Sequence, residues 1–158
     1  MYAVFLDFNG VLDTYQEMDK IDKENLEILR EIVQTMEAKI VISSSIKNTY
    51  YFTGNHNSIM RYLIETLEQA GMEVYGFTPK CNSREKEIIS YLKMHHEITD
   101  YCVLEDEYDL SLLQSHVIKL PSQSIGGNGL KEIGREVIKI LKKGGDKNGK
   151  NWRIKEKN

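Results

Sequence analysis

The chain has 158 residues, of which 41% are hydrophobic and 28% are charged, and this balance predicts one compact domain with a single core. Its two cysteines are too few for a disulfide framework or a cysteine-based metal site. The formal net charge is −3, and no apolar run approaches the roughly 20 residues that span a bilayer, so we expect a cytoplasmic protein without a membrane partner.

The first 140 residues alternate strand-like apolar runs with segments that carry a helical apolar stripe. In chain order, the predicted elements are a strand at 2–7, a helix at 22–37, a strand at 39–43, a helix at 57–70, a strand at 73–77, a helix at 84–95, strands at 101–104 and 116–120, and a helix at 130–141. Asp22 and Ser58 are candidate helix caps, and Gly71 is a stop signal. This alternation predicts an α/β fold: a single Rossmann-like domain with a mainly parallel sheet flanked by helices.

Acidic and hydroxyl side chains follow three of these strands. Asp7 follows YAVFL, the serines at 43–45 follow KIVI, and Glu105 and Asp106 follow YCVL. Ligands of open parallel sheets bind beyond the carboxyl ends of the strands. We therefore expect the three strand ends to converge on one crevice.

The same segments carry a resemblance to a known superfamily. DFNGVLDT at 7–14, ISSSIK at 42–47, REKEIISYL at 84–92 and VLEDEYD at 103–109 resemble, in order, the four motifs of the haloacid dehalogenase (HAD) superfamily. The resemblance covers about 130 residues and is greatest to the capless branch that includes the HAD domains of RNA-repair phosphatases. It implies a phosphohydrolase whose aspartate nucleophile lies on the first strand.

A magnesium site is the first expectation for this crevice. A carboxylate that attacks a phosphoryl group needs a cation beside it, and Mg²⁺ prefers hard oxygen ligands. Asp7 and Asp106 could each supply a carboxylate oxygen, Asn9 its backbone carbonyl, and Glu105 a direct or water-mediated contact. Asp7 would then attack phosphorus to form an aspartyl-phosphate.

Phosphate-binding groups come from the second motif and from the turn after the first strand. The Ser44 hydroxyl could donate to a phosphoryl oxygen, although Ser43 or Ser45 could take this role. Lys47 ends the second motif and is a further candidate for substrate binding. Gly10 allows the backbone to turn tightly and to approach the phosphate.

The cation of the third motif has two candidates. Arg84 and Lys86 both lie in the first turn of the predicted helix at 84–95, and either could neutralise developing charge. The sequence does not decide between them.

Asn9 departs from the pattern of HAD phosphatases, which usually carry Asp at this position to protonate the leaving group and to activate water. General acid–base help is worth typically about 10²–10⁴-fold. The chain could be slow, could use a good leaving group, or could recruit Asp13 or Glu105 as the acid. It could also be an impaired domain that binds phosphorylated ligands, or carry an engineered substitution.

Partners follow from two further features. The segments between motifs are too short for a sizeable cap domain, and an open crevice favours a nucleotide or nucleic-acid end as the phosphorylated substrate. Residues 142–158 hold seven Lys or Arg and two acidic residues, so the rest of the chain carries −8. We predict a phosphatase domain at 1–143 and a basic tail at 144–158 that is either a solvated terminus or a contact for a phosphate backbone.

Overall fold

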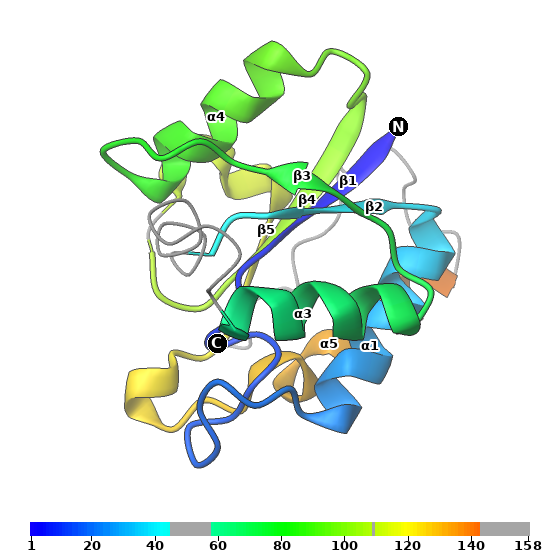
Figure 1. Ribbon diagram of the computed structural model, residues 1–158, viewed down its shortest axis with the longest axis vertical. Helices are drawn as coiled ribbons and strands as arrows, with labels where there is room; N and C mark the ends of the chain where they lie inside the picture. Colours follow the sequence, from blue (N-terminus) through cyan, green and yellow to red (C-terminus); the bar gives the residue numbers. More distant parts are fainter. Residues whose placement is uncertain (45–57, 109, 143–158) are drawn as a thin grey trace.

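The computed structural model describes residues 1–44, 58–108 and 110–142. Five parallel strands form one sheet in the order β3-β2-β1-β4-β5, with helices on both faces (Figure 1). The strands are β1 (Tyr2–Leu6), β2 (Lys39–Ile42), β3 (Val74–Phe77), β4 (Asp100–Glu105) and β5 (Val117–Lys119). The α-helices are α1 (Lys23–Met36), α3 (Ser58–Gln69), α4 (Arg84–Met94) and α5 (Gly134–Lys142), and short 3₁₀ helices span η2 (Ser111–His116), η3 (Gln123–Ile125) and η4 (Gly129–Glu132). The expected fold class is confirmed.

Alternate strand residues enter two separate cores because successive side chains point to opposite faces of a sheet. On one face, Val4 and Leu6 pack in a cluster that includes side chains from α1, α3 and α5. On the other face, Ala3 and Phe5 pack with side chains from α4 and η2. Every residue of β1 is buried, as its continuous apolar run predicted.

The predicted helix boundaries are largely correct. The Asp22 carboxylate caps α1 by accepting from the Asn25 backbone N–H. Gly71 has φ +83° just beyond α3, which is the left-handed conformation that commonly ends a helix. Ser58 is the first residue of α3 and not a cap that precedes it.

The single helix predicted at 130–141 is wrong in its first turn. The chain forms η4 at this point, and α5 begins only at Gly134. A Cβ at Gly134 would overlap the Ile28 side chain, so the chain approaches α1 here more closely than another residue would allow. Close packing against α1 thus overrides the helical periodicity.

The strand register brings the site residues together. Leu6 pairs with Ile42 on one side and with Leu104 on the other. The next residues, Asp7, Ser43 and Glu105, therefore lie along one edge of the sheet.

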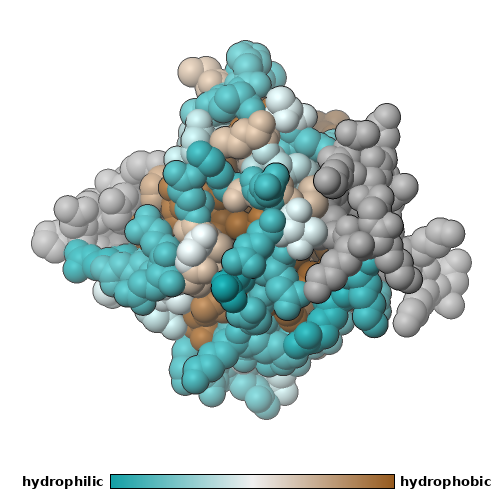
Figure 2. Space-filling view, turned by 90° about the vertical axis from the view of Figure 1, so that its right-hand side faces the viewer, coloured by the Kyte–Doolittle hydropathy of each residue, from teal (hydrophilic) through white to brown (hydrophobic). Residues whose placement is uncertain are grey.

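No inserted cap domain is present in the described ranges, where the chain passes from β1 to α1 by the loop at 7–22. The face shown in Figure 2 is dominated by hydrophilic side chains, with hydrophobic surface visible mainly in the hollows between them. Within the same ranges, no helix combines the length and apolar character needed to cross a membrane.

Candidate active site

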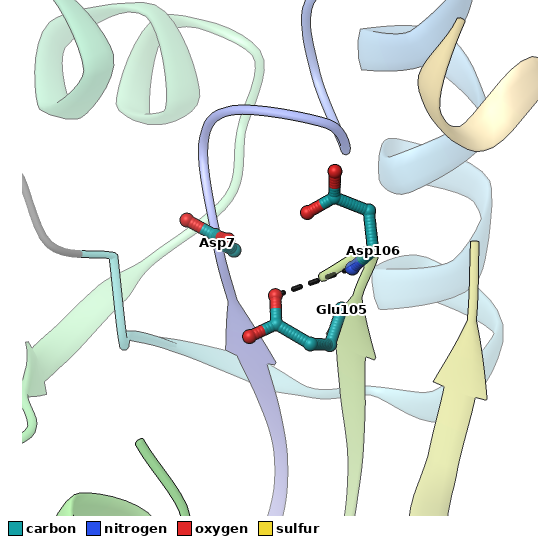
Figure 3. Close-up of side chains that lie close together, drawn as sticks. All are labelled: Asp7, Glu105 and Asp106. Carbon is teal, nitrogen blue, oxygen red and sulfur yellow. Dashed lines mark hydrogen bonds between the residues drawn. The ribbon is translucent and has the colours of Figure 1, made fainter. Parts of the chain in front are cut away.

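Three buried carboxylates meet at the carboxyl edge of the sheet. Asp7 comes directly after β1, while Glu105 ends β4 and Asp106 follows it (Figure 3). Each offers a carboxylate oxygen, and these oxygens lie within 4.8 Å of one another. The cluster could hold a metal ion. Around an octahedral Mg²⁺ with Mg–O bonds of about 2.1 Å, ligand oxygens lie about 3.0–4.2 Å apart, so the carboxylates would need to close slightly around that ion.

Arg84 is the cation beside this cluster. Its guanidinium Nη1 lies 3.6 Å from Asp7 Oδ2 and 3.4 Å from Glu105 Oε1, and its Nε lies 3.8 Å from Glu87 Oε2. The Ser83 side chain caps α4 by accepting from the Lys86 N–H, and this cap sets where the helix and Arg84 begin. The Arg84 side chain is 5% exposed, whereas Lys86 is exposed to solvent outside the crevice.

The electrostatics of the cluster suit a cation. Burial, together with the adjacent Asp7 carboxylate, raises the pKa of Glu105 to about 9. Burial also raises the pKa of Asp106, although the Gln123 N–H that donates to its Oδ2 at 3.1 Å opposes the shift. Several buried acids sharing one site with a single Arg favour protonation until a metal ion balances their charge.

Gly10 is required by the close approach of two strand ends. Its φ is +81°, and a Cβ at this position would overlap the Asp106 carboxylate. Only glycine allows the turn after β1 to pass this close to the carboxylate cluster.

Asn9 belongs to a hydrogen-bond network at the base of the β1–α1 loop. Its Nδ2 donates to Asp13 Oδ2 at 2.7 Å and to Asp19 Oδ1 at 2.8 Å. The fully buried Asp13 carboxylate also accepts from the N–H groups of Gly10 and Asp19 and from Gln123 Nε2, each at 2.8 Å. With both oxygens occupied in the interior, Asp13 is poorly placed to act as the alternative acid.

The second motif is described only in part. Ser43 and Ser44 are buried beyond β2, and the Ser43 N–H donates to the Leu6 carbonyl at 2.9 Å. Ser45 and Lys47 lie outside the described residues, so their expected roles in substrate binding remain predictions.

A crevice of about 340 Å³ opens over the carboxylates. Its lining includes Asp7, Asn9, Arg84 and Asp106 together with residues that sequence reasoning missed: Met18, Glu107, Tyr108, Ser122, Gln123 and Ser124. The Tyr108 ring covers the Arg84 guanidinium at 5.0 Å from the ring centroid. Of these missed residues, only Glu107 and Tyr108 lie inside the fourth motif, which could have singled them out; Met18 and residues 122–124 lie in no motif.

A Rossmann-like sheet with its aspartate after the first strand and an acidic pair at the end of the fourth defines a HAD-type domain. Residues 3–125 match the family described as the HAD domain in Swiss Army Knife RNA repair proteins. The chain belongs to this family, as the sequence resemblance predicted, and the family supports a phosphatase type of function. Comparisons with curated proteins and with solved structures gave no significant match.

Proposed function

We propose that the chain is an Mg²⁺-dependent phosphatase that forms an aspartyl-phosphate on Asp7 and acts on a nucleotide or polynucleotide phosphate. The observation that carries the proposal is the buried cluster of Asp7, Glu105 and Asp106 with Arg84 beside it. Mg²⁺ held by these carboxylates and the Asn9 carbonyl would neutralise charge between Asp7 and the substrate.

The proposed reaction has two displacements at phosphorus. An Asp7 carboxylate oxygen attacks the phosphoryl group and forms a new bond to phosphorus. The bond from phosphorus to the leaving oxygen breaks, and the leaving oxygen keeps its electron pair. Water then attacks the phosphorus of the aspartyl-phosphate, which releases inorganic phosphate and regenerates the carboxylate. Arg84 and the Ser44 hydroxyl stabilise the phosphoryl oxygens in both steps.

Asn9 defines which steps are slow. An amide cannot protonate the leaving oxygen or deprotonate the attacking water, so the leaving group must be a good one or take its proton from solvent. This is also the observation that favours a second candidate function, a domain that binds phosphorylated ligands without efficient turnover. In both cases the same residues hold the phosphate.

Phosphate release from an aryl phosphate, with Mg²⁺ or with a chelator, separates the two functions. A phosphatase shows Mg²⁺-dependent turnover that Asp7→Asn abolishes and Ser44→Ala reduces to a lesser degree. Arg84→Gln should lower kcat/KM by about 10²–10³-fold, because it removes a charged donor to the transition state. Lys86→Gln should cost less than Arg84→Gln, because Lys86 lies outside the crevice.

Binding of inorganic phosphate without any turnover would instead support the binding domain. This binding would be measured on the unmodified chain with Mg²⁺. The Asp7→Asn variant should then bind phosphate in the same way, because binding alone does not require Asp7 to attack phosphorus.

A further inference from the structure

Helix α4 has a second face that the proposed chemistry does not use. Its buried side carries Arg84, Glu87, Ile88 and Tyr91. Its outer side carries Lys86, Ile89, Ser90 and Lys93, which line an open groove of about 510 Å³ with Cys81 and Asn82 from the preceding loop. The spacing of the outer residues places them on one helical stripe.

The two lysines of this groove have no counter-charge bound to them in the part of the chain that the structure describes. Within the described ranges, neither Lys86 nor Lys93 makes a side-chain hydrogen bond or an ion pair, and both are exposed. They are seven residues apart, which separates them by about 10 Å along the helix axis. Since residues 1–141 carry a net charge of −8, this is a local positive groove on an acidic body.

The groove and the active-site crevice share no lining residue, but both reach the first turn of α4. Arg84, the first residue of α4, contacts Asp7 inside the crevice, and Lys86 follows it by two residues on the outer side. In Figure 1 the helix leads away from the end of the sheet where β1 and β4 terminate. A long ligand with one end at Asp7 could therefore continue along α4.

We propose that the outer groove of α4 binds the phosphodiester backbone of a single-stranded polynucleotide whose terminal phosphate lies at Asp7; this rests on the proposed function. Lys86 and Lys93 neutralise two backbone phosphates, which is the sequence-independent part of nucleic-acid binding. Asn82 and Ser90 supply amide and hydroxyl groups for sugar or base edges, and Ile89 supplies apolar contact for a ribose or base. The groove is open, as a polymer path requires.

The test is binding of a labelled single-stranded oligoribonucleotide with a terminal phosphate, measured by fluorescence anisotropy in chelator at several salt concentrations. The Lys86→Gln/Lys93→Gln variant should bind about 10-fold or more weakly, with a salt slope smaller by about 1.4, because two phosphate contacts are lost. Its matched control is Lys23→Gln/Lys139→Gln, which removes two exposed charges from α1 and α5. The control should keep the affinity within a factor of about two, since only general attraction changes.

Equal losses of affinity in the two variants, or no loss in either, would overturn the groove proposal. Binding would then be attributed to the overall charge of the protein or to the basic tail. Displacement of the oligonucleotide by an acidic peptide at the same charge concentration would also overturn it, in favour of a protein partner. Because binding is measured without Mg²⁺ and without turnover, the result is independent of the phosphatase assay. A loss of binding in the Lys86→Gln/Lys93→Gln variant but not in its control, without any hydrolysis by the unmodified chain, would support the groove and refute the proposed phosphatase function.

Discussion

Asn9 occupies the position where a HAD phosphatase usually has its acid, and its amide is built into the surrounding loop. It donates to the carboxylates of Asp13 and Asp19, so a third carboxylate at position 9 would face both of them. Two neighbouring acids favour the protonated form of such a group, which is the form that a general acid needs.

Asn9→Asp should therefore have two opposite effects. The rate on alkyl phosphates should rise by about 10²-fold, because the leaving alkoxide gains a proton donor, whereas aryl phosphates should gain much less. The free energy of unfolding at neutral pH should fall by about 2 kcal/mol, because two hydrogen bonds to carboxylates are lost. Steady-state rates on both substrate classes and urea unfolding measure the two effects.

The control for this substitution is the Asn9→Asp/Asp19→Asn double variant, which returns an amide to the contact between the two positions. It should recover part of the lost stability and keep the gain in rate. Equal alkyl-phosphate rates for the unmodified chain and Asn9→Asp would show that another residue is the acid, and Glu105 would be examined next.

Side chains at the carboxyl ends of strands were the easiest to predict from the sequence. Asp7, Glu105 and Asp106 lie together because a parallel register aligns the ends of β1 and β4. The choice between Arg84 and Lys86 could not be made, because it depends on the rotation of α4 against the sheet. Gln123, which reaches Asp13 from 110 positions along the chain, leaves no local signal.

The turn that follows β1 tolerates substitution poorly at Gly10. Gly10 combines a positive φ with van der Waals proximity to Asp106. Gly10→Ala should add about 1 kcal/mol of backbone strain and also displace the Asp106 carboxylate, so Mg²⁺ should no longer raise the melting temperature.

Gly71 provides a matched control for this turn. Its φ is +83°, but a Cβ there would meet no atom within 4 Å. Gly71→Ala should therefore carry a similar strain and retain the full thermal shift with Mg²⁺. An equal Mg²⁺ shift in both variants would show that Asp106 does not take part in metal binding.

Element types were well predicted, and the errors arise where long-range packing decides. The five strands and α1, α3 and α4 follow from apolar period and caps, which are local properties of the chain. The η4 turn and the late start of α5 depend on how closely Gly134 approaches Ile28 in α1. Contacts of that kind leave no periodic pattern in the sequence.

At the scale of the whole molecule, the acidic cluster couples stability to pH. The pKa of Glu105 is about 9 in the folded protein against an ordinary value of 4.5, so the folded state holds an extra proton between these values. This stabilisation is fully present below about pH 4.5 and is lost as the pH rises toward 9. The shift of Asp106 acts in the same direction.

Without metal, the free energy of unfolding should therefore fall as the pH rises from 5 to 8, with a contribution from Glu105 of at most about 1.4 kcal/mol per pH unit. Mg²⁺ competes with these protons, so the stabilisation that it adds should grow over the same range. Urea unfolding with Mg²⁺ or chelator measures both trends, and Glu105→Gln should flatten the slope in chelator. A Mg²⁺ effect that is constant with pH would place the metal away from these acids.

The central claim is that Asp7 carries the phosphoryl group, and Asn9 makes this claim measurable. Because an amide cannot activate the water that breaks the aspartyl-phosphate, the intermediate should accumulate in the unmodified chain. After brief reaction with an aryl phosphate and Mg²⁺ followed by acid quenching, peptide mass spectrometry should find one phosphoryl group on the segment that contains Asp7. The group should be absent with chelator and in Asp7→Asn. Undiminished phosphate release by a verified Asp7→Asn protein would contradict the account.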